Sequence, residues 1–482
     1  MEKILNFIDG SYQEPINKKY IENYNPSEGK VYSLIADSDK DDVDLAVKSA
    51  KKAFDAWSKT TTQERSNFLN KIADLLEEKL DLFAKAEAKD QGKPFNLAKS
   101  VDIPRAIHNF RFFADFILYH KEEATNLNNI ALNYTTRKPL GIVGLISPWN
   151  LPLYLLTWKI APALAMGNVV ICKPSEFTSM TAFMLGEILN LAALPKGVCN
   201  IVMGTGKNVG KEMVLNKNIA GISFTGGTFT AKEIIRDSAE TFKKLSLELG
   251  GKNPNIIYAD ANLEECITTT IRSSFSNQGE ICLCGSRIYV QEEIYDIFVE
   301  KFVKEVEKLV IGDPFDEKTN IGALVSKQHF DKVMYYIDLA QKEGGKILTG
   351  GYKPELSDDL KDGYFIKPTI ITNLDNSCRT IQEEIFGPVV TISKFKTQEE
   401  VINYANDTIY GLSTSIWTQD ISKALQTAEK IEAGTIWINT WMLRDLRVPF
   451  GGMKASGIGR EGGQYSMDFY TELKNVCIKY VN

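Results

Sequence analysis

The sequence predicts an α/β protein with two doubly wound α/β domains and a small β element for oligomerisation. First, 482 residues are too many for a single hydrophobic core. Second, apolar strand-like runs alternate with amphipathic helical patterns in two units, from about residue 139 and from about residue 255. Such alternation produces parallel sheets with right-handed crossovers. Third, residues 129–138 and 476–481 have strand patterns outside both units.

The N-terminal part of the chain precedes the first alternating unit. Short strands and turns come first, followed by a predicted helix over residues 41–57. Apolar residues at three- and four-residue spacing predict long helices over 62–90 and 100–120. Pro104 suits the first turn of the second long helix, because a backbone N–H has no helical partner there.

Each alternating unit predicts its own elements. The first is expected to contain strands at 141–146, 169–172, 200–202 and 221–224, with helices at 153–165, 178–193, 208–215 and 228–240. The second is expected to contain strands at 255–258, 287–290 and 435–438, with helices at 262–276, 292–309, 326–343 and 420–431. We expect one domain over 1–120 and 140–250, a second over 251–455, and bridging strands at 121–139 and 460–482. Projecting strands of this kind can pair with another subunit.

Composition excludes several classes of protein. A hydrophobic content of 44% is ordinary for a globular chain, and a net charge of −6 argues against binding nucleic acid or an anionic membrane. The N-terminus lacks the pattern of a secretory signal, and no apolar run is long enough for a membrane helix. Seven scattered cysteines predict no disulfide framework, which favours the cytoplasm. The three histidines show no metal-site spacing, so no metal is expected.

Residues 275–284 form a candidate reactive turn that ends on two cysteines, Cys282 and Cys284. A thiol between a helix and a strand, beside Gly279, can be partly exposed and reached by backbone N–H groups. Those conditions lower the pKa of a cysteine and admit a substrate. The alternative is a buried structural thiol, since free cysteines are often buried. The scarcity of histidine means that a nucleophilic Cys282 needs another kind of base.

Two polar residues at predicted strand ends are candidates for partners of this thiol. Asn150 closely follows the strand at 141–146, where its amide can donate to a developing oxyanion. Its alternative role is that of a turn residue bonded to its own backbone. Glu248 ends an apolar strand beside Gly250, and partial burial would raise its pKa toward the range of a general base. Its alternative role is that of a salt-bridged strand end.

A nucleotide site is predicted at the carboxyl ends of the first unit's strands. Lys173 and Glu176 can both bond ribose hydroxyls, and Glu176 would repel a 2′-phosphate, which favours NAD over NADP. A solvated loop is the alternative. Residues 224–228 join a strand to a helix, where glycine and free N–H groups suit a pyrophosphate. Gly206 and Gly210 do not match the GxGxxG fingerprint and are weak evidence by themselves.

In this order, from about residue 5 to the C-terminus, these motifs resemble the aldehyde dehydrogenase superfamily. The resemblance rests on residues 247–251, on Phe275, Gly279, Glu280 and Cys282, and on Glu384 with Phe386. It implies that Cys282 attacks an aldehyde, that Asn150 binds the oxyanion, and that hydride transfer leaves a thioester. Glu248 would then activate water, rather than coenzyme A, to release the acid.

The resemblance also implies a Rossmann-like NAD-binding first domain, a catalytic second domain and NAD as the cofactor. Gly227 departs from the family, which often has serine there, so one hydroxyl contact would be lost. The implied cofactor-binding residues are Ile146, Ser147, Pro148, Trp149, Lys173, Ser175, Glu176, Gly206, Gly210, Phe224, Thr225, Gly226, Gly227, Thr228, Leu249, Glu384 and Phe386.

Within the superfamily, residues 102–105, 279–284 and 441–447 resemble the 2-aminomuconic and 2-hydroxymuconic semialdehyde dehydrogenases. The resemblance places two arginines in a substrate tunnel that is commonly apolar, and a guanidinium there suits a substrate carboxylate. Alternatively the arginines pair with protein acids such as Asp102 or Asp445, with Arg447 as a substitute clamp. The implied substrate-binding residues are Arg105, Arg444, Asn150, Cys282 and Trp158.

Two other functions remain open on the sequence. One is a broad-specificity NAD aldehyde dehydrogenase for betaine, succinic or aromatic aldehydes, in which the arginines are structural. The other is a non-catalytic protein that keeps the fold, against which the intact Cys282, Glu248 and Asn150 argue. The expected partners are a small aldehyde and further copies of the chain, as a homodimer or homotetramer.

Overall fold

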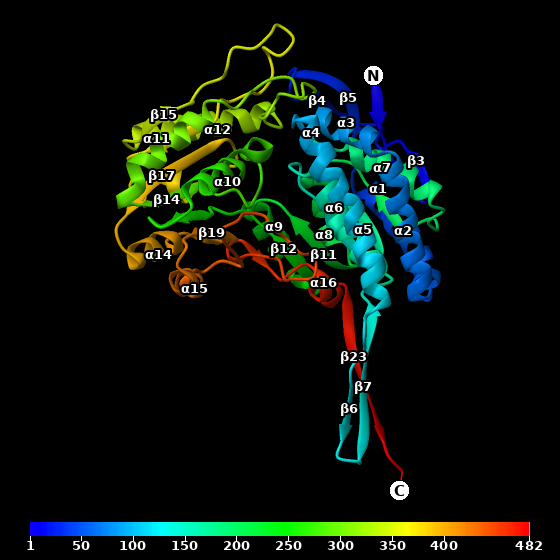
Figure 1. Cartoon of the computed structure of the whole chain (residues 1–482). Coiled ribbons are helices and arrows are strands. Elements are labelled where there is room, and N and C mark those ends of the chain that lie inside the picture. The colour runs from blue at the N-terminus through cyan, green and yellow to red at the C-terminus, as the bar shows by residue number, and fades with distance from the viewer. Residues whose placement is uncertain (482) are drawn as a thin grey trace.

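The computed structural model describes residues 1–481, and Figure 1 shows two α/β bodies side by side with a narrow β arm below them. The first body contains an eight-stranded sheet in the order β22-β12-β11-β8-β9-β10-β2-β3. Its strands are β2 (Asn6–Ile8), β3 (Ser11–Gln13), β8 (Ile142–Ile146), β9 (Val169–Lys173), β10 (Cys199–Ile201), β11 (Ile219–Thr225), β12 (Lys244–Glu248) and β22 (Gly457–Ile458). Strands β8 to β12 pair in parallel, whereas β2 and β22 add antiparallel edges.

Helices cover this sheet on both faces, as the alternating pattern predicts. They are α1 (Lys40–Trp57), α2 (Thr62–Glu78), α3 (Leu80–Gln91), α5 (Ile103–Leu118), α6 (Pro152–Ala165), α7 (Met180–Leu191), α8 (Lys211–Leu215), α9 (Thr228–Ser238) and α16 (Gly463–Phe469). The predicted helix over 62–90 is two helices, because Lys79 leaves helical geometry at φ −105° and ψ 17°. A π-helical turn, Ala98–Asp102, and the short α4 (Phe95–Leu97) precede α5. Strands β1 (Glu2–Ile4), β4 (Tyr20–Asn25) and β5 (Lys30–Ala36) form a small separate sheet.

The second body contains a seven-stranded sheet in the order β15-β16-β17-β14-β13-β19-β20. Its strands are β13 (Pro254–Ile257), β14 (Arg287–Gln291), β15 (Lys346–Thr349), β16 (Thr369–Thr372), β17 (Val389–Phe395), β19 (Ser413–Trp417) and β20 (Thr435–Ile438). Its helices are α10 (Leu263–Phe275), α11 (Tyr295–Val306), α12 (Lys327–Lys342), α13 (Arg379–Gln382), α14 (Gln398–Asn406) and α15 (Ile421–Lys430). β18 (Tyr410–Gly411) pairs with β21 (Met453–Lys454). Two α/β domains are therefore present, as predicted.

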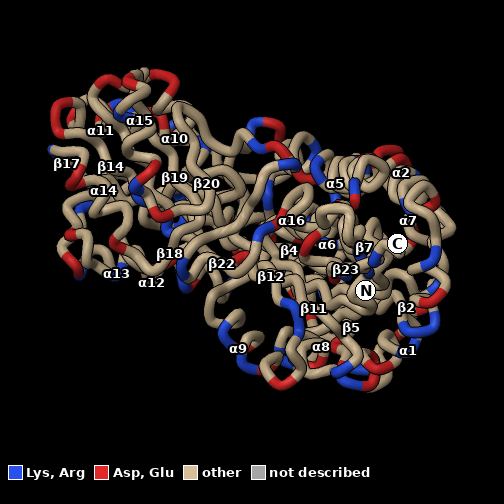
Figure 2. Tube along the Cα trace, turned by 90° about the horizontal axis from the view of Figure 1, so that it is seen from below, with Lys and Arg blue, Asp and Glu red and all other residues tan. Residues whose placement is uncertain are grey.

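The arm is a three-stranded antiparallel sheet of β6 (Ala124–Leu127), β7 (Ala131–Pro139) and β23 (Thr471–Lys479). The prediction of bridging strands over 460–482 is wrong for residues 463–469, which form the helix α16. β23 itself begins five residues before the strand pattern of 476–481, because its early side chains are exposed and show no apolar period. In Figure 2, Lys and Arg are interspersed with Asp and Glu, so this view shows no continuous basic surface for nucleic acid. Among residues 1–481, no helix is long and apolar enough to cross a membrane.

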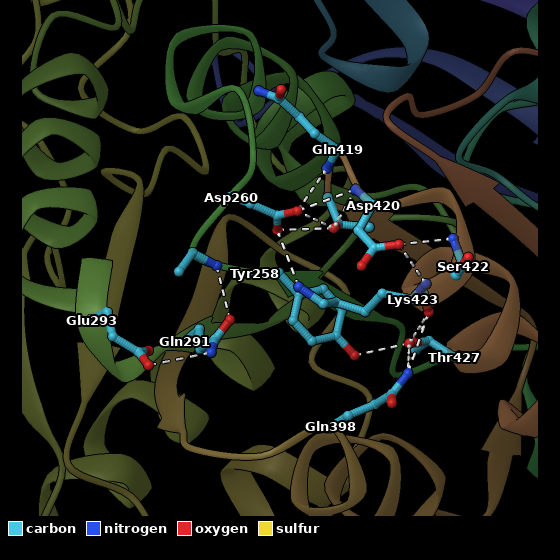
Figure 3. A network of polar contacts seen from close by, with 12 residues as sticks. Tyr258, Asp260, Gln291, Glu293, Gln398, Gln419, Asp420, Ser422, Lys423 and Thr427 are labelled. Carbon is cyan, nitrogen blue, oxygen red and sulfur yellow. Dashed lines mark hydrogen bonds and ion pairs between the residues drawn. The ribbon is translucent and has the colours of Figure 1, made fainter.

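In the second domain, a polar network joins the loop after β13 to the start of α15 (Figure 3). The Asp260 carboxylate accepts hydrogen bonds from the Thr418 hydroxyl at 2.8 Å and from the backbone N–H groups of Gln419 and Asp420 at 3.2 and 3.1 Å. The Asp420 side chain caps α15 by accepting from the N–H groups of Ser422 and Lys423. The network thus satisfies donors that the helix itself leaves free.

Replacing Asp260 with alanine is expected to lower the free energy of unfolding by about 1–2 kcal/mol, because two backbone donors and one hydroxyl lose a charged acceptor. Urea unfolding followed by tryptophan fluorescence measures the change. Asp358→Ala is the matched control, since the Asp358 side chain is 97% exposed. Equal midpoints for the two variants would contradict a structural role for the network.

Candidate active site

Two adjoining cavities lie at the carboxyl ends of the first sheet, and Trp149, Thr225 and Gly226 line both. The larger measures about 580 Å³, and the predicted residues that line it are Ile146, Ser147, Pro148, Trp149, Lys173, Ser175, Glu176, Gly206, Gly210, Phe224, Thr225, Gly226 and Gly227. The smaller measures about 260 Å³, and the predicted residues that line it include Asn150, Leu249, Cys282, Glu384 and Phe386. Thr228 lines neither cavity and donates from its hydroxyl to the Ala455 carbonyl at 3.4 Å.

The larger cavity has the polar groups that a nucleotide needs. Lys173 Nζ donates to Glu176 Oε2 at 3.1 Å, and the Gly206 N–H donates to Glu176 Oε1 at 3.3 Å. Burial acts to raise the pKa of Glu176, but the positive charge of Lys173 and the hydrogen bonds from Lys173 and the backbone together hold that pKa below its usual range. A carboxylate anchored in this way can accept from ribose hydroxyls while Lys173 donates to them.

The N-terminus of α9 opens into the same cavity. Gly227 is its N-cap, in extended conformation, and a Cβ added at Gly227 would have nothing within 4 Å. A Cβ at Gly226 would instead lie 2.4 Å from the Phe224 ring, so this turn requires glycine. The free N–H groups of an eleven-residue helix suit a pyrophosphate that approaches the open backbone of Gly227.

Cys282 lies in the smaller cavity, on the turn between α10 and β14. Asn277 and Gln278 adopt left-handed backbone conformations there, and a Cβ at Gly279 would lie 2.3 Å from the Gly387 carbonyl. The expected lowering of the thiol pKa is wrong for this structure. Burial, followed by the nearby charges of Glu384 and Glu248, raises the pKa of Cys282 to about 12. The thiol therefore needs a proton acceptor at neutral pH.

Glu248 is buried at the end of β12. Within residues 1–481, neither of its carboxylate oxygens has a hydrogen-bond partner. Burial, and then repulsion from Glu461, raises the pKa of Glu248 well above its usual range. Lys159 Nζ and Trp158 Nε1 donate to Glu461 at 3.0 and 2.7 Å, so the indole N–H of Trp158 is already engaged. An orphaned, proton-accepting carboxylate of this kind is suited to activating water.

The Asn150 side chain lies beside Cys282 in the smaller cavity. Its Nδ2 donates to the Glu280 carbonyl at 2.8 Å, which fixes the amide while a second hydrogen remains for a ligand oxyanion. Opposite, Glu384 accepts from the Gly251 N–H at 2.9 Å. The Phe386 carbonyl lies 2.6 Å from His329 Nε2, and the Phe386 ring packs edge-on against Trp149. These contacts form the walls of a closely packed reaction chamber.

Arg105 and Arg444 converge on one tyrosine, Tyr154. The guanidinium carbon of Arg105 lies 5.3 Å from the centre of the Tyr154 ring, and Arg444 Nη1 donates to the Tyr154 hydroxyl at 3.2 Å. Burial, and then the charge of Arg444, acts to lower the pKa of Arg105. Arg105 Nε and Nη2 are buried and have no hydrogen-bond partner anywhere in the part of the chain that the structure describes. Unpaired buried guanidinium donors of this kind suit an anionic ligand such as a carboxylate.

The two acids that were alternative partners of these arginines are bound elsewhere. Asp102 forms a buried ion pair with Lys93. Asp445 accepts from Arg447 Nε at 2.9 Å, and both of these side chains are exposed. Arg447 is therefore engaged at the surface and is a poor substitute clamp.

Sequence reasoning missed four residues of this neighbourhood: Lys93, Tyr154, Asn277 and Glu461. Tyr154 had a usable signal, because it lies four residues before Trp158 on the same face of α6. Asn277 lies inside the candidate turn of residues 275–284, but its contact with Asn150 has no signal in the sequence. Lys93 and Glu461 act through contacts across large sequence separations, for which the sequence has no local signal.

A thiol, a buried carboxyl group and an amide donor beside a nucleotide-sized cavity fit an oxidoreductase of the thiol-dependent, aldehyde-oxidising class. The aldehyde dehydrogenase family model matches residues 12–476, and the chain belongs to this family. It is 52% identical to 2-aminomuconic semialdehyde dehydrogenase of Mus musculus, covering 98% of both chains. It is 43% identical to 2-hydroxymuconic semialdehyde dehydrogenase of Pseudomonas sp. (strain CF600), covering 99% of this chain and 100% of that relative.

A solved structure has the same fold. The NAD⁺ complex of an aldehyde dehydrogenase from Bacillus cereus superposes with a TM-score of 0.97 at 40% identity, covering 100% of this chain and 97% of the other.

Proposed function

We propose that this chain is an NAD-dependent dehydrogenase that oxidises 2-aminomuconate or 2-hydroxymuconate 6-semialdehyde to the dicarboxylic acid. The observation that carries the proposal is the pair of half-buried arginines, Arg105 and Arg444, neither of which forms an ion pair with a carboxylate within residues 1–481. The mouse and Pseudomonas relatives support the same substrate class. A substrate with an aldehyde at one end and a carboxylate at the other complements both the thiol and the arginines.

The Cys282 thiol gives its proton to water, and the resulting thiolate adds to the aldehyde carbon and forms a thiohemiacetal. The Asn150 amide and the Cys282 backbone N–H donate to the oxyanion that develops, where fixed donors stabilise charge better than mobile water does. Lys173, Glu176 and the N-terminus of α9 would hold NAD, and Glu384 and Phe386 would contact its nicotinamide end. When bound, NAD supplies the hydride acceptor, so that loss of hydride from the substrate carbon leaves a thioester on Cys282.

Glu248 then takes a proton from a water molecule, which attacks the thioester carbonyl. The thioester bond breaks, the acid leaves, and Cys282 regains its proton. Glu176 disfavours a 2′-phosphate at the ribose, which supports NAD over NADP.

Replacing Arg444 with methionine tests the substrate. We expect kcat/KM for 2-hydroxymuconate semialdehyde to fall about 10²-fold, because charge-assisted hydrogen bonds to the carboxylate are lost. Turnover of benzaldehyde, which has no carboxylate, should change by less than about threefold. NADH formation measures both rates. Arg447→Met is the control, since Arg447 is exposed and pairs with Asp445.

Equal losses on both aldehydes would make Arg444 structural and favour the broad-specificity dehydrogenase. Equal turnover of all aldehydes by the unmodified protein would discard the muconic substrate and leave the dehydrogenase class intact.

The same proposal covers the organisation of the chain. Residues 1–120 and 140–250 form the cofactor-binding domain, 251–455 the catalytic domain, and 121–139 with β23 the bridging strands. Leu473 and Ile478 on β23 are exposed apolar residues of the arm, which favours its burial in a homodimer or homotetramer. We place the enzyme in the cytoplasm.

A further inference from the structure

A buried lysine, Lys93, contacts the backbone of Asn150 and does not line the smaller cavity. Lys93 follows α3 directly and is fully buried. Its Nζ donates to Asp102 and, at 3.0 Å, to the Asn150 carbonyl oxygen, with Glu87 Oε1 3.8 Å away. Burying an ammonium is costly unless it is paired and hydrogen-bonded, so these partners hold the Lys93 ammonium at one place.

A second donor reaches the same carbonyl oxygen from the other domain. Asn277 Nδ2 donates to the Asn150 carbonyl at 3.0 Å from the left-handed turn that precedes Cys282. Asn150 itself returns a hydrogen bond from its side chain to the Glu280 carbonyl. The backbone carbonyl of Asn150 is therefore held by a donor from each domain, and its side-chain amide is held by the second domain.

Charge neutralisation alone does not explain this arrangement. Glu87 and Asp102 are buried, and burial raises the pKa of both while Lys93 opposes the rise. A cation that served only these acids would not need to donate to the backbone of residue 150. The Lys93–Asn150 contact spans 57 residues and joins the acid cluster to the oxyanion donor.

We infer that Lys93 is a positioning residue for aldehyde oxidation, which holds Asn150 where its amide meets the oxyanion on the thiohemiacetal. The inference rests on the proposed function, because it takes Asn150 as the oxyanion donor. Positioning matters at this point, since displacing a reacting group by about 1 Å can cost about 10²-fold in rate. Lys93 acts through Asn150 and touches neither the substrate nor the cofactor.

The test is a double-mutant cycle on the rate of the first NADH turnover, with Lys93→Met made in the unmodified enzyme and in Asn150→Ala. We expect Lys93→Met to slow the unmodified enzyme about 10²-fold and the Asn150→Ala enzyme less than about twofold. The KM for NAD should stay unchanged, whereas a general loss of structure would alter it. Lys85→Met, on the exposed face of α3, is the control.

Asn277→Gly is an independent test of the same inference if Lys93→Met does not fold. Glycine tolerates the left-handed backbone, removes the second donor and leaves the Lys93 charge cluster intact. The same non-additivity with Asn150→Ala is expected for Asn277→Gly. Equal slowing by Lys93→Met, or by Asn277→Gly, in both backgrounds overturns the inference and leaves the proposed function standing. An unmodified enzyme that forms no NADH from any aldehyde refutes the proposed function and the inference with it.

Discussion

Replacing Cys282 with alanine is expected to abolish NADH formation, with a loss of about 10⁴-fold or more, because no covalent intermediate can form without the nucleophile. Steady-state assays with 2-hydroxymuconate semialdehyde measure the loss. NAD affinity, followed by quenching of tryptophan fluorescence, should be preserved, since the larger cavity does not include Cys282. A variant that kept full NADH production would show that Cys282 is not the nucleophile.

Cys284→Ala is the matched control for this prediction. Cys284 lies two residues further along the same turn, but it is buried in an apolar cluster with Trp437 and Trp441 and lines neither cavity. Its loss should therefore lower activity by less than about tenfold, through packing alone. A larger loss for Cys284→Ala than for Cys282→Ala would reverse the assignment of the two thiols.

The raised pKa of Cys282 means that the thiol must lose a proton before it can react. A thiol with a pKa of about 12 is protonated at neutral pH, so its reactivity depends on a neighbouring proton acceptor. The residues that raise this pKa include Glu248 and Glu384, and both repel the thiolate when they are ionised. The sequence could not show this, because the turn has local features that favour a thiolate while burial, which opposes it, is a property of the folded protein.

The fold was largely predictable, because the alternation of strands and helices is a local property of the chain. The sequence did not show where a helix breaks, or how far a strand extends, when no apolar pattern marks the position. The helix over 62–90 breaks at Lys79, although no glycine or proline marks that position. β23 extends back to Thr471 because it pairs along its whole length with β7, and this pairing involves backbone groups.

The candidate site divides in the same way. Motif residues such as Asn150 and Glu248 follow strands, so their place at one sheet edge follows from topology. The choice of ion-pair partners, by contrast, does not follow from the topology. Asp102 lies three residues before Arg105 and was an alternative partner for it, but in the folded chain Asp102 forms its ion pair with Lys93. That choice leaves Arg105 unpaired, and the sequence alone cannot decide it.

Replacing Glu248 with glutamine is expected to leave one rapid turnover of NADH per active site and to slow every later turnover about 10²- to 10⁴-fold. Glutamine keeps the size of the side chain but cannot take a proton from water, so the thioester persists on Cys282. Stopped-flow absorbance measures the burst, and mass spectrometry of the quenched protein detects the acyl adduct. Loss of the burst together with turnover would instead assign Glu248 to deprotonating the thiol.

The pH dependence of turnover tests the same role independently. Burial, and then Glu461, raises the pKa of Glu248, and the carboxylate is the active form of the base. Turnover should therefore rise with pH until Glu248 is ionised. Glu461→Gln removes the nearby like charge, which lowers the pKa of Glu248 and should move the acidic limb of the profile to lower pH. An acidic limb that stays in place in Glu461→Gln and persists in Glu248→Gln would belong to another group, and Glu248 would not be the base.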